Sequence, residues 1–128
     1  MRANGAWAPN TKTLPWRGTS AGGGYSTVGD LLKFAEVLAS HRILSAHSLE
    51  EATKVQSKGG RGYGYGFETG NRGGVQFFGH GGGAPGMNGV LHVYLETRTV
   101  VAVLSNLTPP AANYAAEWLY QRMPHPTP

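Results

Sequence analysis

The spacing of hydrophobic residues divides the chain into three parts. Residues 1–24 follow neither a helical nor a strand period and contain the run Gly22-Gly23-Gly24, which predicts an irregular arm. Residues 25–123 carry regular helical and strand patterns. Residues 124–128 include three prolines and form a proline-rich tail. We therefore expect one folded subdomain between the arm and the tail.

A first helix is predicted to begin after Thr27. Thr27 is followed three residues later by Asp30, which resembles a capping box with Asp in place of the usual Glu or Gln. The next hydrophobic residues recur at spacings of three and four and form one stripe that faces a core: Leu31, Phe34, Ala35 and Leu38.

Two further helices are expected. Ser48 begins a second capping pattern, Ser48-Leu49-Glu50-Glu51, and predicts a short helix that ends at about Val55. Thr108 as N-cap, with Pro109 in the first helical position, predicts a last helix that ends at the proline-rich tail. The buried stripe expected for this helix consists of Ala111, Ala115, Trp118 and Leu119.

Between the second and last helices the hydrophobic period changes to two. Tyr63, Tyr65 and Phe67 alternate with glycines, which predicts a strand with three aromatic rings on one face. A turn at 70–74 follows. Three more strands are expected at 75–79, 90–95 and 99–105, the last two joined by a hairpin at 96–98.

These elements predict an α+β fold. About four strands form an antiparallel meander, and the N-terminal and C-terminal helices cover it. On this arrangement we expect the other face of the sheet to stay uncovered by this chain.

Composition narrows the possible functions. The 128 residues contain no cysteine, which excludes disulfides and thiolate chemistry, and a formal net charge of +4 is spread over the chain as expected for a solvated surface. No stretch approaches the roughly 18 apolar residues needed to span a bilayer, and the start lacks the apolar region of a signal peptide. A soluble domain is expected, and its compartment stays open.

The run from Phe78 to Gly89 combines many glycines with one imidazole, His80. Glycine within or beside a strand costs about 0.5–1 kcal/mol relative to alanine. A dense group of glycines therefore indicates that something approaches the backbone closely, and a substrate is one candidate.

Several motifs together resemble the C-terminal part of the serine β-lactamase-related family, which includes class C β-lactamases, D-alanyl-D-alanine carboxypeptidases and related esterases. The resemblance covers residues 20–122, and the motifs occur in the family's order. They are Ala21-Gly22-Gly23-Gly24-Tyr25-Ser26-Thr27 leading into Asp30-Leu31-Leu32-Lys33-Phe34, then Gly62 to Phe67, Gly79-His80-Gly81-Gly82, and Pro85-Gly86.

The resemblance implies roles for the glycine-rich run. His80-Gly81-Gly82 matches the family's His-x-Gly element, so His80 would orient the acyl-transfer network or the substrate carboxylate. Gly81 and Gly82 would let the substrate lie along the strand. The backbone N–H of Gly83 would be one oxyanion donor, a kind of contact worth about 2.7–4 kcal/mol in acyl-transfer enzymes.

Two of the family's three elements are missing from the sequence. No lysine has a serine three residues before it, so there is no Ser-x-x-Lys nucleophile element, and no asparagine follows a tyrosine at a spacing of two. We therefore expect a fragment of a serine hydrolase that supplies the His-x-Gly strand and the oxyanion wall and does not catalyse a reaction alone. Its ligand in the full-length context would be an ester, a β-lactam or a peptide-like small molecule.

Other functions remain as alternatives. The first is a non-catalytic module that binds a partner or self-associates, because an exposed sheet face and edge that normally meet the absent half favour a homodimer through this sheet surface. The Gly/Arg/aromatic segment 58–67, with Arg72 after it, superficially resembles a nucleic-acid-binding stretch, but its period of two fits a strand better, so we expect no nucleic acid. The sequence contains no complete phosphate-binding loop motif, and no metal or other cofactor is expected.

Overall fold

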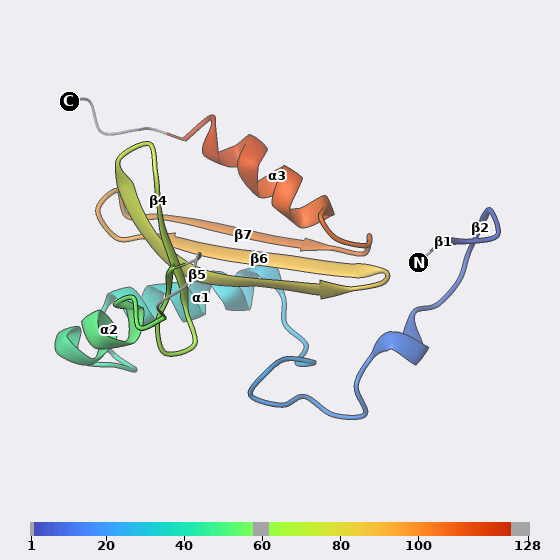
Figure 1. Ribbon diagram of the computed structural model, residues 1–128, viewed down its shortest axis with the longest axis horizontal. Coiled ribbons are helices and arrows are strands. Elements are labelled where there is room, and N and C mark those ends of the chain that lie inside the picture. The colour runs from blue at the N-terminus through green and yellow to red at the C-terminus, as the bar shows by residue number, and fades with distance from the viewer. Residues whose placement is uncertain (1, 58–61, 124–128) are drawn as a thin grey trace.

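The computed structural model describes residues 2–57 and 62–123. The arm contains two very short strands and one turn of 3-10 helix, and the rest of the described chain forms three helices and a sheet (Figure 1). In chain order the elements are β1 (Arg2–Ala3), β2 (Ala6–Trp7), η1 (Thr11–Thr13), α1 (Val28–Ala39), α2 (Ala46–Thr53), β3 (Gly62–Tyr63), β4 (Glu68–Arg72), β5 (Val75–Ala84), β6 (Met87–Tyr94), β7 (Thr99–Ser105) and α3 (Ala111–Tyr120).

The sheet confirms the predicted α+β class and the antiparallel meander. Its order is β3-β4-β5-β6-β7, so each strand lies beside its neighbours in the sequence. It has five strands where about four were expected, because residues 68–72, part of which were predicted as a turn, form the additional strand β4.

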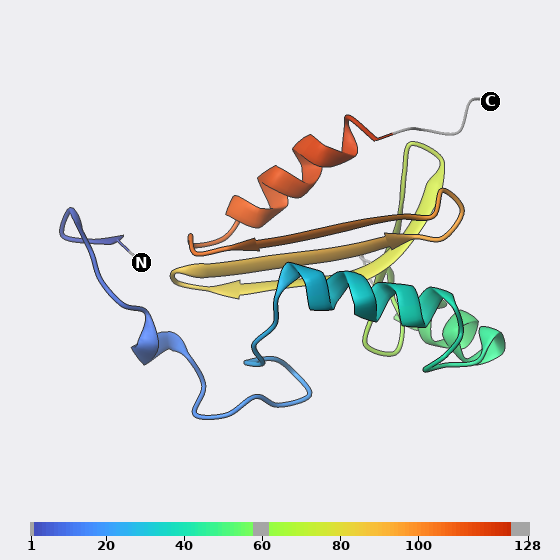
Figure 2. The same cartoon turned by 180° about the vertical axis from the view of Figure 1, so that it is seen from behind.

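The helices lie on opposite faces of the sheet. Helix α3 covers one face, and α1 and α2 lie on the other, as the views from front and back show (Figure 2). The expectation of an uncovered face was wrong. Alternate strand residues are apolar on both sides, so each face needs its own cover. Two buried clusters result: one at α3 with Val75, Val90, Tyr94 and Val101, and one at α1 and α2 with Phe78 and Val93.

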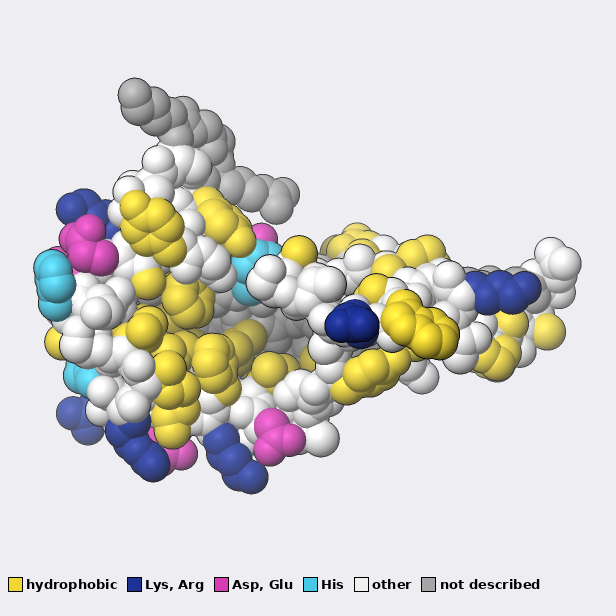
Figure 3. All heavy atoms as spheres, turned by 90° about the horizontal axis from the view of Figure 1, so that it is seen from below, with side chains coloured by type: hydrophobic (Ala, Val, Ile, Leu, Met, Phe, Trp, Pro, Cys, Tyr) yellow, Lys and Arg dark blue, Asp and Glu magenta, His cyan; other side chains and the backbone are white. Residues whose placement is uncertain are grey.

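Helix α1 begins as the sequence predicts. Thr27 is its N-cap, and the Thr27 hydroxyl oxygen accepts a hydrogen bond from the Asp30 backbone N–H at 3.1 Å. Ala35 and Leu38 of the predicted stripe are buried against the sheet, but Phe34 is exposed. Figure 3, seen from the side of α1 and α2, shows hydrophobic side chains gathered on this face.

Helix α2 begins one turn earlier than predicted. Its N-cap is Ser45, whose hydroxyl oxygen accepts from the Ser48 backbone N–H at 3.1 Å and shares a hydrogen bond with the Ser48 hydroxyl at 2.8 Å. The predicted cap, Ser48, therefore stands in the first turn. Two serines three residues apart offer equivalent capping hydroxyls, and in the helix that begins after Ser45 the side chain of Leu49 is buried.

The strand predicted from Tyr63 to Phe67 is wrong. Strand β3 ends at Tyr63, and the chain then turns so that Gly64 N–H donates to the Phe67 carbonyl at 2.8 Å. Tyr65 is 68% exposed, whereas Phe67 packs edge-on against Phe78. The predicted turn at 70–74 is mostly strand β4. Alternation of glycine with aromatic residues is also compatible with a turn, because glycine adopts the left-handed backbone conformation of turns as readily as the extended conformation of strands.

Helix α3 begins two residues later than predicted, and its buried stripe is shifted by one position. Ala112 and Ala116 are buried, while Trp118 and Leu119 of the predicted stripe are exposed. The alanine-rich sequence has no strong pattern to distinguish the two faces. The predicted N-cap, Thr108, accepts instead from the Gly86 backbone N–H at 3.0 Å.

The side chain of Asn88, a residue of strand β6, caps the start of α3. Its side-chain oxygen accepts from the Ala112 backbone N–H at 2.7 Å, and its amide nitrogen donates to the Gly82 carbonyl at 2.8 Å. The side chain is buried, and its bond to Ala112 forms away from water, whereas its bond to Gly82 is partly buried. One asparagine thus connects the glycine-rich strand to the start of the last helix.

A cluster of aromatic and charged side chains lies between the sheet and α3. Arg72 of β4 forms an ion pair with Glu117 of α3, and its guanidinium lies 5.5 Å from the ring centroids of Phe77 and Tyr120. His92 lies beside them, with its ring centroid 4.6 Å from that of Phe77. Burial, and secondly the positive charge of Arg72, lowers the pKa of His92 from 6.5 to about 4, against a smaller opposing effect of Glu117.

We expect the free energy of unfolding to fall between pH 6.5 and 4 because of His92. Over this window the unfolded chain binds a proton at His92 that the folded chain does not bind, so stability decreases as the pH falls. The loss is on the order of 2–3 kcal/mol by linkage. Urea unfolding at several pH values measures it. His92→Phe removes the group and should flatten this part of the profile, whereas exposed His47→Gln should not; equal slopes in all three proteins would contradict the prediction.

Candidate active site

Strand β5 extends beyond its partner on one side. Strand β4 pairs with residues 75–79 of β5, from Arg72↔Val75 to Glu68↔Gly79. Strand β6 pairs with β5 over the longer range 78–84, up to Ala84↔Met87. Residues 80–84, which contain the predicted site, therefore have no strand partner on the β4 side within the part of the chain that the structure describes.

The backbone groups of Gly81 and Gly83 point to this free edge. The two-residue loop Pro85-Gly86, with Gly86 at φ +78°, makes Ala84 and Met87 the closing hydrogen-bonded pair of the hairpin. In an antiparallel ladder the residues of a strand alternate between one neighbour and the other. Gly82 and Ala84 therefore bond to β6, and Gly81 and Gly83 direct N–H and C=O outward.

An open groove of about 690 Å³ lies between this end of the sheet and the arm. Its walls include Gly82 and Gly83 at the free end of β5, residues 87–89 of β6, Leu104 of β7 and residues 21–26 of the preceding segment. The arm is held at the β5–β6 turn, where Asn10 Nδ2 and Thr13 Oγ1 donate to the Pro85 carbonyl at 3.4 and 3.2 Å. His80 and Gly81 do not line the groove, although they continue the same strand.

His80 takes part in a hydrogen-bond network with Tyr63. The Tyr63 hydroxyl lies 2.9 Å from His80 Nε2, and His80 Nδ1 lies 2.6 Å from the Gly81 carbonyl oxygen. The two rings are perpendicular, with centroids 5.7 Å apart. The structure thus brings His80, Gly81 and a residue from β3 together at one point of the strand.

Sequence reasoning missed Tyr63 and Asn88 as residues of this region. Tyr63 belongs to a series of three aromatics with equal spacing, and only the end of β3 distinguishes it from Tyr65. Asn88 lies near the end of the glycine-rich run, and a polar residue beside a hydrophobic strand pattern is a signal that could have identified it.

The glycines of the run are required for different reasons. A Cβ at Gly79 would lie 1.8 Å from the Leu91 carbonyl oxygen, and one at Gly83 would lie 2.6 Å from the Pro109 ring and 2.7 Å from the Met87 carbonyl oxygen. A Cβ at Gly82 would meet no atom within 4 Å. The close approach predicted for this backbone is therefore made within the chain at Gly79 and Gly83, and Gly82 faces open space.

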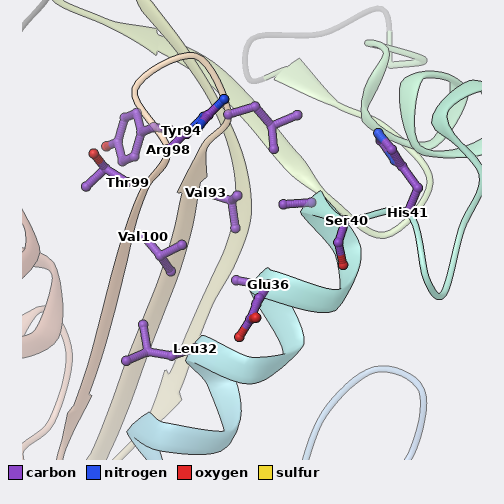
Figure 4. A pocket seen from close by; sticks show the side chains of 12 residues that line it. Leu32, Glu36, Ser40, His41, Val93, Tyr94, Arg98, Thr99 and Val100 are labelled. Carbon is purple, nitrogen blue, oxygen red and sulfur yellow. The ribbon is translucent and has the colours of Figure 1, made fainter.

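A second cavity, of about 790 Å³, lies at the opposite end of the sheet. Leu32 of α1 and Val93 and Val100 of the sheet line it, and Glu36 and Ser40 stand along the helix side (Figure 4). It shares no lining residue with the groove along β5. The free edge is therefore the region where the predicted site residues gather.

The described residues contain neither a metal-binding cluster nor a membrane-spanning helix. Across 2–57 and 62–123, no three histidine or acidic side chains come close enough together to hold a metal ion. None of the helices in these ranges combines the length and apolar character needed to cross a bilayer. The predicted nucleic-acid alternative rests partly on Lys58 to Arg61, which lie outside the described residues, as does the proline-rich tail.

A sequence model of the β-lactamase family matches residues 1–122. The chain belongs to the β-lactamase family. The resemblance drawn from the motifs is confirmed by this match. No curated protein sequence matches the chain.

Solved structures of two relatives show the same fold. A penicillin-binding protein from Bacillus halodurans superimposes with a TM-score of 0.78 and 25% identity over 93% of this chain and 37% of that protein. An octameric penicillin-binding protein homologue from Pyrococcus abyssi gives a TM-score of 0.64 and 33% identity over 80% of this chain and 26% of that protein. This β-lactamase-family chain therefore spans about a third of the length of these relatives.

We predict that Gly83→Ala destabilises the fold by about 1–3 kcal/mol, because the new methyl group meets a proline ring and a backbone carbonyl that cannot both move away. Gly82→Ala is the matched control: its methyl group meets open space, so stability should stay equal or rise slightly. Thermal and urea unfolding of both variants measure the difference. Equal midpoints for the two variants would show that the strand does not pack as described.

Proposed function

We propose that this chain forms one wall of the acyl-transfer cleft of a serine hydrolase that cleaves an ester or amide through an acyl-enzyme. The observation that carries the proposal is the free edge of β5, where a family-typical His-x-Gly element stands beside two outward-facing glycines. Membership of the β-lactamase family supports this reaction class. An ester, a β-lactam or a peptide-like molecule would lie along residues 81–83.

The geometry suits oxyanion binding by Gly83. Its N–H belongs to a residue that points away from β6, and it stands in the wall of the groove. The side of the strand behind it is closed by Pro109 and Asn88, which hold the backbone in place. A donor fixed before the substrate arrives needs no reorganisation when negative charge develops on the substrate oxygen.

His80 would act beside the oxyanion donor without covalent chemistry of its own. Its ring is bound to Tyr63 and to the Gly81 carbonyl, which fixes its orientation on the strand. The nucleophile and its base would come from residues outside this sequence, because the Ser-x-x-Lys and Tyr-x-Asn elements are absent from it. We therefore propose that the chain does not turn over substrate alone.

The proposal predicts where a substrate-like ligand contacts the isolated chain. Titration of the ¹⁵N-labelled chain with benzylpenicillin or an N-acyl-D-alanyl-D-alanine peptide at millimolar concentration should shift the amide signals of Gly81 and Gly83, because these N–H groups point to the free edge of β5. Amides of Val93 and Arg98, at the second cavity, serve as the internal control. Shifts confined to that cavity, or none along residues 81–83, would contradict the proposed cleft wall.

The proposal also predicts that the isolated chain has no catalytic activity. Hydrolysis of nitrocefin and p-nitrophenyl acetate by the isolated chain should not exceed the buffer rate. Robust turnover that a single Ser→Ala substitution abolishes would show that the chain contains its own nucleophile, and the division of roles proposed above would then be wrong.

A second candidate function is self-association, and exposed aromatic residues favour it. On the outer side of α3, Tyr114 is 71% exposed and Trp118 is 55% exposed, and Leu119 lies beside them. Large exposed aromatic side chains on one helix favour an interaction site, and the Arg122 guanidinium lies 4.0 Å from the Trp118 ring centroid. The Pyrococcus abyssi relative is described as octameric, which gives the proposal a precedent within the fold.

Self-association through α3 predicts a mass that rises with concentration in sedimentation velocity. Trp118→Gln should weaken this association because it removes the largest exposed apolar side chain of the helix. Trp16→Gln is the matched control, since Trp16 is 98% exposed but stands in the arm. A monomer mass independent of concentration would exclude the candidate, and an equal effect of both substitutions would assign the association to another surface.

A further inference from the structure

Tyr63 reaches the site from an element that is itself firmly held. Strand β3 pairs Tyr63 with Glu68 of β4. On its other side the Tyr63 carbonyl accepts hydrogen bonds from the backbone N–H groups of Gln56 and Ser57, at 2.8 and 3.2 Å. The two-residue strand is thus anchored to the segment after α2 and to the sheet, and the phenol ring projects from a fixed point toward His80.

The two contacts of His80 determine which ring nitrogen carries the proton. The Gly81 carbonyl oxygen can only accept a hydrogen bond, so the 2.6 Å contact requires a proton on Nδ1. In the neutral ring Nε2 then has a lone pair and no proton. The Tyr63 hydroxyl at 2.9 Å is a donor that matches it. The two bonds therefore favour the same tautomer.

We infer that Tyr63 is a positioning residue: its hydroxyl donates to Nε2 of His80, holds the ring as the Nδ1–H tautomer, and so fastens the ring to the Gly81 carbonyl at the free edge. The role assigned to this network in catalysis rests on the proposed function. The tautomer and the hydrogen bonds themselves do not depend on it.

This arrangement changes what the free edge of β5 offers to a ligand. An unmodified edge presents N–H donors and C=O acceptors in equal number. Here the Nδ1–H of His80 bonds to the Gly81 carbonyl, so the N–H groups of Gly81 and Gly83 and the C=O of Gly83 remain directed outward without a strand partner among the described residues. The edge is therefore rich in donors, and it suits a ligand that presents carbonyl or carboxylate oxygens more than an extended strand that needs both kinds of partner.

The inference can be tested on the ligand-free chain by ¹⁵N NMR of the histidine rings, which distinguishes the two neutral tautomers. At a pH where the ring is neutral, His80 should be mainly in the Nδ1–H form. Tyr63→Phe keeps the ring and removes only the hydroxyl, so Nε2 loses its donor, and the Nε2–H fraction should rise several-fold. Tyr65→Phe, two residues away on the exposed turn, should leave the spectrum of His80 unchanged.

Two results would overturn the inference. A wild-type His80 that is mainly Nε2–H would exclude donation from Tyr63 whether or not any variant folds. An unchanged His80 tautomer in a folded Tyr63→Phe chain would show that Tyr63 does not control it. Because no ligand is present, these outcomes are separate from the penicillin titration: if Gly83 does not respond there while the tautomer changes here, the proposed function fails and the positioning role stands.

Discussion

The unequal length of two neighbouring strands is the constraint on which the site depends. Strand β5 has ten residues and β4 has five, so β4 leaves the second half of β5 without a partner on one side. An unpaired edge is normally a liability, since it invites pairing with another chain. Here the end of the edge, at Gly82 and Gly83, borders a groove, and under the proposed function the outward N–H groups of Gly81 and Gly83 would bind a substrate oxygen.

The free edge is stable because the strand behind it is held from both faces of the sheet. On the α3 face, buried Asn88 bonds to the Gly82 carbonyl and to the start of α3, and the ring of Pro109 lies against Gly83. On the other face, the ring of His80 is bound by Tyr63. Polar groups that are fully paired in this way add rigidity, which a site for developing charge requires. The same strand, β5, therefore both packs into the sheet and carries the groups of the candidate site.

Much of the fold could be predicted because local rules were sufficient. The Thr27 cap acts through neighbours in the sequence, and so does the hairpin between β6 and β7, which the sequence predicts at 96–98 and which follows Tyr94 in the structure. The predictions failed where the local sequence allowed two alternative helix starts or two alternative buried faces. Ser45 and Ser48 were both possible caps of α2, and the alanine-rich α3 had no clear apolar side. In each case burial against the sheet selected one solution.

The sequence by itself determined the family, the fold class and the position of the glycine-rich run, because motif order and hydrophobic period are properties of the chain alone. It also identified His80 and Gly83 as candidates. Only the tertiary structure decided that Gly83 faces a free edge and that Tyr63 is the partner of His80. These facts depend on where β4 stops and on how a two-residue strand is anchored, and no local pattern encodes a contact between residues seventeen positions apart.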